Sequence, residues 1–200
     1  MNNIYLKGHI RNIEHSHDIE DIEFSKANLI VKRSNGNDDV INLRFKSFSN
    51  NYKENDLIEI VGNIRSYSYK IDENTNKVVI YVFTYFDKVE EENLCTNMGE
   101  LDGRICKINN LRTTKTGKHN IHFILANNII SNSNTKRLNS YIPCIAWGKI
   151  AKELSELDVN TKLKVNGELH SREHKKVHDN GEIEIRVAHE FLVTSYEVLD

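Results

Sequence analysis

The chain has 200 residues, which fits one large domain or two domains of about 100 residues each. It carries 27 Lys+Arg against 29 Asp+Glu, and its pI near 6.5 lies far below the basic range typical of a dedicated duplex-DNA binder. No apolar run is long enough to span a membrane, and the N-terminus lacks the basic and apolar regions of a signal peptide. We therefore expect a cytoplasmic protein.

Two halves of the chain share one layout of short alternating strands. In the first half, a segment of alternating apolar and polar residues interrupted by Gly8 is followed by a second such segment around Gly62. A polar turn and a last alternating strand come after it. The second half repeats this order with Gly103 and Gly167. The offset grows from 95 residues between the first glycines to 105 between the second, which indicates one repeated fold with about ten residues inserted in the second copy.

The inserted residues are predicted to form a short helix. Residues 148–157 place Ile150, Leu154 and Leu157 on one helical stripe, directly after the third strand of the second half. Each half otherwise reads as about five short strands. Between the halves lies an acidic segment without strand alternation, which suits a linker.

Five strands with a helix after the third are typical of the OB-fold, a partly open barrel that binds oligonucleotides or oligosaccharides on one face. We predict an all-β protein with one short helix, built from two tandem five-stranded OB-fold barrels. The predicted domains are residues 1–88 and 99–200, joined by an acidic linker at 89–98. An ordinary β-sandwich is the alternative, because strand counting alone does not fix topology.

Residues that could carry chemistry do not form a catalytic motif. The sequence holds no phosphate-binding loop, nucleophile elbow or zinc-protease helix. His15 and His17 lack further ligands, and His170, His174 and His178 lie between a strand and a turn instead of on a helix. We expect no enzyme activity, no metal and no cofactor. An OB-fold nuclease is the least favoured alternative, because no carboxylate and arginine set is positioned for hydrolysis.

The charge is divided unevenly between the halves. Residues 1–95 carry 12 Lys+Arg against 16 Asp+Glu, a balance of −4, whereas residues 96–200 carry 15 against 13, a balance of +2. Cations of the second half gather in two predicted hairpin connections, which flank the binding groove in an OB-fold. These cations are Arg112, Lys115 and Lys118 in one segment and Arg172, Lys175 and Lys176 in the other. The alternative is that these two segments are ordinary solvent-exposed turns with no role in binding.

Aromatic side chains are predicted to face outward from the strands. If residues 141–147 form one strand, Tyr141 and Trp147 share a face, and the small Cys144 and Ala146 share the other with Ile142. Outward rings could stack on bases of a single strand. A core position for Trp147 is the alternative. In the first half, period two places three candidate binding residues on one face: Arg65, Tyr67 and Tyr69.

The second half resembles a known family. Residues 141–154, with the sequence YIPCIAWGKIAKEL, closely resemble the third strand and helix start of bacterial single-stranded-DNA-binding proteins. LKVNGELHSR at 163–172 looks like the fourth strand of that family, and LDGRI at 101–105 and FILAN at 123–127 are similar to its first two strands. The resemblance covers residues 98–195 in order, whereas the first half matches only in pattern.

The resemblance implies a nucleic-acid interface. It implies that Tyr141, Trp147 and His174 stack on bases, with His174 where the family often has a tryptophan, and we include Arg104 of the first matching strand among the candidates. The sequence ends at Asp200 without the Gly/Pro-rich linker and acidic tip of the family. This ending fits a phage, plasmid or conjugative-element version, or a primosomal relative.

The resemblance also implies partners. We expect single-stranded DNA bound with little sequence preference, in replication, recombination or mobile-element transfer. Tandem barrels in one chain resemble family members that pair two-fold, so we also expect a homodimer presenting four barrels. An OB-fold module that contacts replication or conjugation proteins, with little or no DNA contact, is the alternative.

Overall fold

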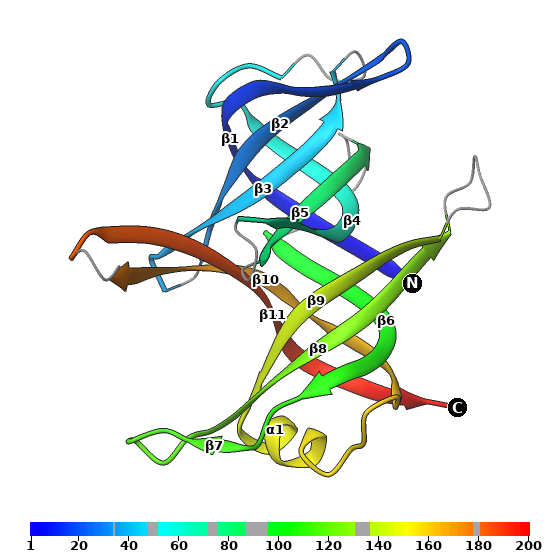
Figure 1. The fold of residues 1–200 in the computed structure, drawn as a ribbon, viewed down its shortest axis with the longest axis vertical. Coiled ribbons are helices and arrows are strands. Elements are labelled where there is room, and N and C mark those ends of the chain that lie inside the picture. Colours follow the sequence, from blue (N-terminus) through cyan, green and yellow to red (C-terminus); the bar gives the residue numbers. More distant parts are fainter. Residues whose placement is uncertain (34, 48–51, 72–75, 87–95, 131–136, 178–180) are drawn as a thin grey trace.

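The structure is a computed structural model that describes residues 1–33, 35–47, 52–71, 76–86, 96–130, 137–177 and 181–200. These residues form an eleven-stranded sheet with one helix, and the sheet curls into two barrels stacked along the long axis of the molecule (Figure 1). Within the described ranges, no helix is long and apolar enough to cross a membrane.

The N-terminal barrel is closed by its first five strands. Its strands pair in the order β2-β3-β5-β4-β1, and β1 returns to β2 to close the ring. The β3–β5 pairing is parallel and the other pairings are antiparallel. The strands are β1 (Asn2–Ile19), β2 (Ile22–Lys32), β3 (Asp38–Lys46), β4 (Leu57–Lys70) and β5 (Asn76–Phe86).

The C-terminal barrel repeats this topology, in the order β6-β10-β11-β9-β8 with β8 closing on β6. The β9–β11 pairing is the parallel one. Its elements are β6 (Asn97–Ile108), β7 (Arg112–Thr113), β8 (His119–Ile130), β9 (Arg137–Trp147), α1 (Gly148–Leu154), β10 (Lys162–Val177) and β11 (Ile183–Leu199). The predicted OB-fold class is confirmed, and the β-sandwich alternative is wrong. Residues 87–95 lie outside the described residues, so the predicted domain boundaries stay a prediction.

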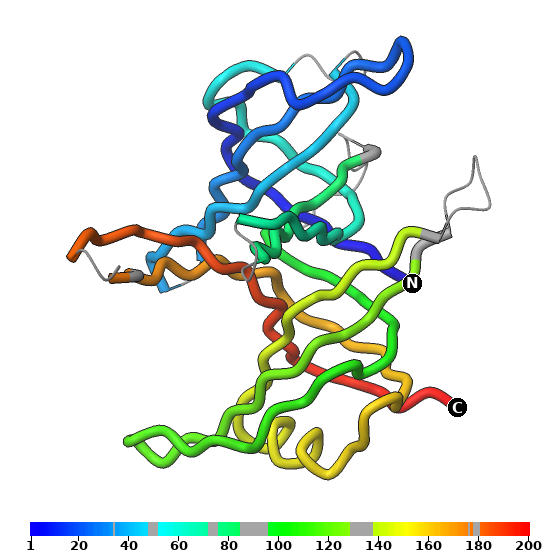
Figure 2. The backbone as a smooth tube through the Cα atoms, in the orientation of Figure 1, coloured from blue at the N-terminus to red at the C-terminus, as the bar shows by residue number. Residues whose placement is uncertain are grey.

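The two barrels share a seam. Strand β1 pairs antiparallel with β6, from Asn2 opposite Leu101 to Leu6 opposite Asn97, so the backbone runs as one sheet through both barrels (Figure 2). The Asn2 side-chain Nδ2 also donates to the Ile64 carbonyl at 2.7 Å and to Asn127 Oδ1 at 2.8 Å. The seam therefore fixes the barrels relative to each other.

The glycine repeat has a structural cause. A Cβ on Gly8 would collide with the Ile30 carbonyl, and a Cβ on Gly103 would collide with the Ala126 carbonyl of the second barrel. At both positions a neighbouring strand approaches too closely for a side chain, as expected where a barrel strand bends. The 95-residue offset thus marks equivalent points of the two folds.

Helix α1 packs at the end of the C-terminal barrel (Figure 1). Ala151 and Leu154 are fully buried, and Ile150 and Leu157 pack against the core, which confirms the predicted apolar stripe. The helix ends at Leu154, three residues before the predicted end.

A ribbon of two strands projects beyond the C-terminal barrel. The β10–β11 pairing continues to Val177 opposite Ile183, and this hairpin extends to the side of both barrels (Figure 1). Arg172 to Lys176, predicted to be a hairpin connection, therefore lie in strand β10. The backbone of this segment pairs with β11, while the side chains of residues 172–175 are exposed, which explains why hydrophobic alternation did not reveal a strand there.

Candidate nucleic-acid interface

A groove of about 880 Å³ lies where the two barrels meet. One wall comes from the N-terminal barrel, where the β2–β3 hairpin contributes Lys32, Arg33 and Asn35. The other wall comes from the C-terminal barrel, and includes Arg112 of β7 and Trp147 at the end of β9. The groove is therefore a composite of both halves of the chain.

Trp147 stands at one end of this groove. It also lines a second hollow of about 530 Å³ with three lysines, namely Lys118, Lys149 and Lys152. The Trp147 side chain is 41% exposed, whereas Ile142, Cys144 and Ala146 are buried inside the barrel. The alternative that Trp147 belongs to the core is therefore wrong. Trp147 therefore borders both the composite groove and a hollow rimmed by lysines.

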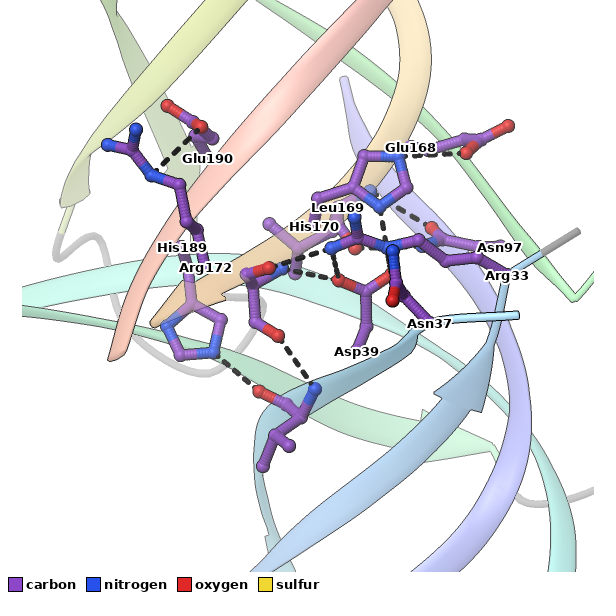
Figure 3. A network of polar contacts seen from close by, with 12 residues as sticks. Arg33, Asn37, Asp39, Asn97, Glu168, Leu169, His170, Arg172, His189 and Glu190 are labelled. Atoms are coloured by element: carbon purple, nitrogen blue, oxygen red, sulfur yellow. Dashed lines mark hydrogen bonds and ion pairs between the residues drawn. The ribbon is translucent and has the colours of Figure 1, made fainter. Parts of the chain in front are cut away.

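A polar network in the groove wall connects the barrels (Figure 3). The carboxylate of Asp39 on β3 is fully buried and accepts hydrogen bonds from Arg33 Nε at 2.7 Å and His170 Nδ1 at 2.8 Å. The Ser171 amide on β10 donates to the same carboxylate. Burial alone would raise the pKa of Asp39, but these donors outweigh burial and hold the pKa far below its ordinary value.

Two histidines of the C-terminal barrel complete the network. Both ring nitrogens of His170 face carboxylates, because Nε2 lies 3.0 Å from Glu168 and Nδ1 faces Asp39. His189 is buried, and its Nε2 donates to the Val40 carbonyl at 2.8 Å. Burial lowers the pKa of His189 and favours its neutral form.

The carboxylates of the groove are paired with cations of the groove. Glu190 lies 3.6 Å from His122 Nδ1 and 3.9 Å from Arg172 Nε, and Asp39 and Glu168 belong to the network above. Lys32 and Arg112 have no ion-pair partner in the part of the chain that the structure describes. The groove therefore has uncompensated positive charge on both walls.

Several predicted site residues come together here. Arg112, Trp147 and Arg172 line the groove, and Lys118 lies on the far side of Trp147. Tyr141 is 51% exposed in the middle of β9, outside the groove, and its backbone amide donates to Ser66 Oγ of the N-terminal barrel at 2.7 Å. The outward orientation predicted for both rings agrees with their exposure.

The other predicted residues of the C-terminal half lie elsewhere. His174 and Lys175 are exposed on the β10–β11 ribbon, and Lys115 is exposed in the turn between β7 and β8. The side chain of Lys176 lies outside the described residues. Arg104 Nη1 donates to the Asn160 carbonyl at 2.9 Å, away from the groove. A role for these five residues stays a prediction.

The three candidates of the N-terminal barrel form a separate cluster. The Arg65 guanidinium lies 4.2 Å from the Phe83 ring centroid. Tyr67 and Tyr69 stack with centroids 6.2 Å apart. None of the three lines the composite groove.

The contribution of the N-terminal barrel to the groove has no signal in the local sequence. Lys32 and Arg33 belong to a half with a negative charge balance, and their position beside the C-terminal barrel depends on the seam between β1 and β6. Lys149 and Lys152 were missed among the predicted site residues. Their i, i+3 spacing places them on one side of α1, which was a usable signal.

Comparison with known proteins agrees with this architecture. The single-strand binding protein family matches residues 96–194. The match covers the half that carries Arg112, Trp147 and Arg172 and confirms the resemblance drawn from the sequence. No curated protein matches the chain.

Solved structures resemble the whole chain. The wild-type single-stranded DNA binding protein from Thermus aquaticus superposes with a TM-score of 0.73 at 17% identity, covering 100% of this chain and 93% of that chain. A deletion mutant of the same protein gives the same TM-score and covers 94% of that chain. At this identity the likeness shows a shared fold, including the N-terminal barrel that the family match does not reach.

Proposed function

We propose that this protein binds single-stranded DNA with little sequence preference, and that the composite groove is its strand-binding site. The observation that carries the proposal is the position of Trp147, half exposed between a groove with unpaired cations on both walls and a hollow rimmed by three lysines. Aromatic rings that stack on bases and cations that follow phosphates are the two requirements of such a site. The family match over residues 96–194 supports the same function.

The roles divide among the groove residues. Trp147 stacks on a base, while Arg112, Arg172 and Lys32 contact phosphates. Lys118 and the α1 lysines hold the strand after it passes Trp147. Tyr141 and the ribbon cations Lys175 and Lys176, with His174, Lys115 and Arg104, extend the contact outside the groove. We place this binding in DNA replication, recombination or mobile-element transfer.

Fluorescence polarisation of a labelled thymidine oligonucleotide tests this function. The protein should bind the single strand in preference to a duplex of the same length, and Arg112→Ala combined with Arg172→Ala should weaken binding. Lys53→Ala, which removes an exposed lysine away from the groove, serves as the control. Equal affinity of the double variant and the control would show that the strand binds elsewhere.

We also propose a homodimer that presents four barrels. One face of the β10–β11 ribbon exposes four apolar side chains, between 43% and 66% exposed, which a second copy would bury: Val177, Ile183, Ile185 and Val187. Sedimentation at micromolar concentration should give twice the chain mass, and a species of 23.2 kDa would contradict a dimer.

The same apolar face supports the second candidate function, contact with a replication or conjugation protein. For that candidate, Ile183→Ser and Ile185→Ser should leave both DNA affinity and sedimentation unchanged while abolishing capture of the partner. Loss of the dimer on the same substitutions would favour the homodimer instead.

A further inference from the structure

The outer edge of strand β11 is open along the projecting ribbon. On its inner side β11 pairs with β10 as far as Ile183, whereas on its outer side it pairs with β9 only from Phe191 to Val193. In the ranges that the structure describes, no strand pairs with this outer edge between Ile183 and His189. This part of β11 belongs to the ribbon that projects to the side of both barrels (Figure 1). An open edge of this length is a template for pairing with another strand.

The pairing with β10 fixes the direction of the backbone groups on this edge. The Ser171 amide on β10 donates away from β11, to the Asp39 carboxylate. In an antiparallel pair, two opposite residues direct their backbone groups either toward each other or both away from each other. His189 lies opposite Ser171, so its N–H and C=O groups point outward. The register from there to the end of the ribbon is regular, so every second residue back to Ile183 has the same direction.

The side chains along this edge suit a paired strand. Ile183, Ile185 and Val187, whose backbone groups point outward, lie on one face of the ribbon and are exposed. Residues 183–189 contain neither the lysine nor the proline with which native sheets usually protect an open edge. The edge therefore combines outward backbone groups with apolar side chains.

The sequence around Ile185 is complementary to itself when two copies run in opposite directions. Glu184 and Arg186 lie on either side of Ile185 and form an ion pair at 2.7 Å within the chain. When Ile185 lies opposite its own counterpart, Glu184 of one copy lies opposite Arg186 of the other, and Ile183 lies opposite Val187. A register centred on Glu184 or on Arg186 would place identical charges opposite each other, which is destabilising. The charges therefore select the register centred on Ile185.

We propose that two copies of this chain pair antiparallel through the outer edges of β11, about a two-fold axis at Ile185. The two ribbons then form one sheet of four strands, with backbone hydrogen bonds across the axis and ion pairs between Glu184 and Arg186 of different copies. The same patch meets itself in this arrangement, so the contact closes at two copies. This inference rests on the homodimer proposed above and assigns its interface.

Charge exchange tests the interface by sedimentation equilibrium. Glu184→Lys alone and Arg186→Glu alone should each raise the dissociation constant of the dimer about tenfold, because two favourable cross-strand pairs become two repulsive ones. The double variant exchanges the charges and should restore the dissociation constant to within a few-fold of the unmodified value, which a merely misfolded ribbon would not do. Glu156→Lys, the same charge change at an exposed residue of the C-terminal barrel, should leave the dimer unchanged.

Cysteine substitutions test the register. Ile185→Cys should give a disulfide-linked dimer on oxidation with copper phenanthroline, because the Cα atoms of a hydrogen-bonded antiparallel pair lie about 5.5 Å apart, within the range of a disulfide. Ile183→Cys alone should give no such dimer, whereas Ile183→Cys combined with Val187→Cys should. The unmodified protein, in which Cys106 is exposed, gives the background.

The outcomes separate this interface from the proposals on which it rests. A dimer that neither single charge variant weakens, or that Ile185→Cys does not cross-link, would overturn the interface and leave the homodimer in place. A species of 23.2 kDa at every concentration would overturn the homodimer and this interface together. Strand binding is tested separately, by the affinity of the same variants for a thymidine oligonucleotide.

Discussion

Asp39 of the N-terminal barrel and His170 of the C-terminal barrel lie 2.8 Å apart, from the Oδ2 carboxylate oxygen to the Nδ1 ring nitrogen. The contact joins β3 to the free edge of β10, beyond the point where β6 stops pairing with β10 at Gly167. Since both residues line the composite groove, the contact that holds the barrels together also shapes the proposed strand-binding site.

Removal of the Asp39 charge should loosen this junction. In Asp39→Asn, Arg33 and His170 lose their common partner, and loss of one member of a buried pair is strongly destabilising. We expect the free energy of unfolding to fall by about 2–3 kcal/mol, less than the usual roughly 3–5 kcal/mol for breaking a buried pair, because Arg33 is partly exposed. Urea denaturation measures the change. Asp38→Asn, at the exposed neighbour, is the matched control and should be close to neutral.

The same pair predicts how stability depends on pH. The pKa of Asp39 is lowered by folding, so its contribution is fully present above the ordinary Asp pKa of about 4 and is lost progressively as the pH falls from there toward the much lower pKa of the folded state. The difference in stability between the unmodified protein and Asp39→Asn should therefore be largest near pH 7 and should decrease steadily as the pH is lowered below 4. A difference that grows on acidification would contradict the assigned direction of the pKa shift.

Truncation of the exposed ring should weaken strand binding. We expect Trp147→Ala to lose roughly 1–3 kcal/mol of affinity for a thymidine oligonucleotide, the usual contribution of one stacked base. Trp147→Phe should retain most of the affinity, because a smaller ring still stacks. Polarisation titrations measure both variants. A folded Trp147→Ala protein with unaltered affinity would show that the ring takes no part.

The N-terminal wall should contribute to the salt dependence. If Lys32 contacts a phosphate, Lys32→Ala should reduce the slope of log affinity against log salt by about 0.7, the value for one contact with a single strand. Lys53→Ala, an exposed lysine of the same barrel outside the groove, should leave the slope unchanged. Identical slopes for the two variants would restrict the site to the C-terminal barrel.

The strands and their inner faces could be predicted because local pattern determines them. Period two placed Cys144 inside and Trp147 outside, and the structure agrees, while the offset between Gly8 and Gly103 identified the repeat. The end of β10 could not be predicted in this way. Arg172 and Lys175 pair with β11 through the backbone while their side chains are exposed, so they leave no hydrophobic alternation.

The composite groove could not be predicted, because it depends on contacts between residues far apart in the sequence. The pairing of Asn2 with Leu101 and the bond between Asp39 and His170 bring Lys32 and Arg112 into one groove. Neither contact has a signature in local sequence. The charge balance of −4 in the first half did not favour Lys32 as a binding residue, because a total charge does not show where individual cations lie.

Titration of Trp147 emission with a thymidine oligonucleotide at low salt tests the central claim most directly, because the chain has no other tryptophan. Binding in the composite groove should quench the emission in a saturable way, and added salt should restore it as phosphate contacts weaken. Emission that stays constant, with no complex in a gel-shift experiment, would contradict the assignment of this groove to single-stranded DNA.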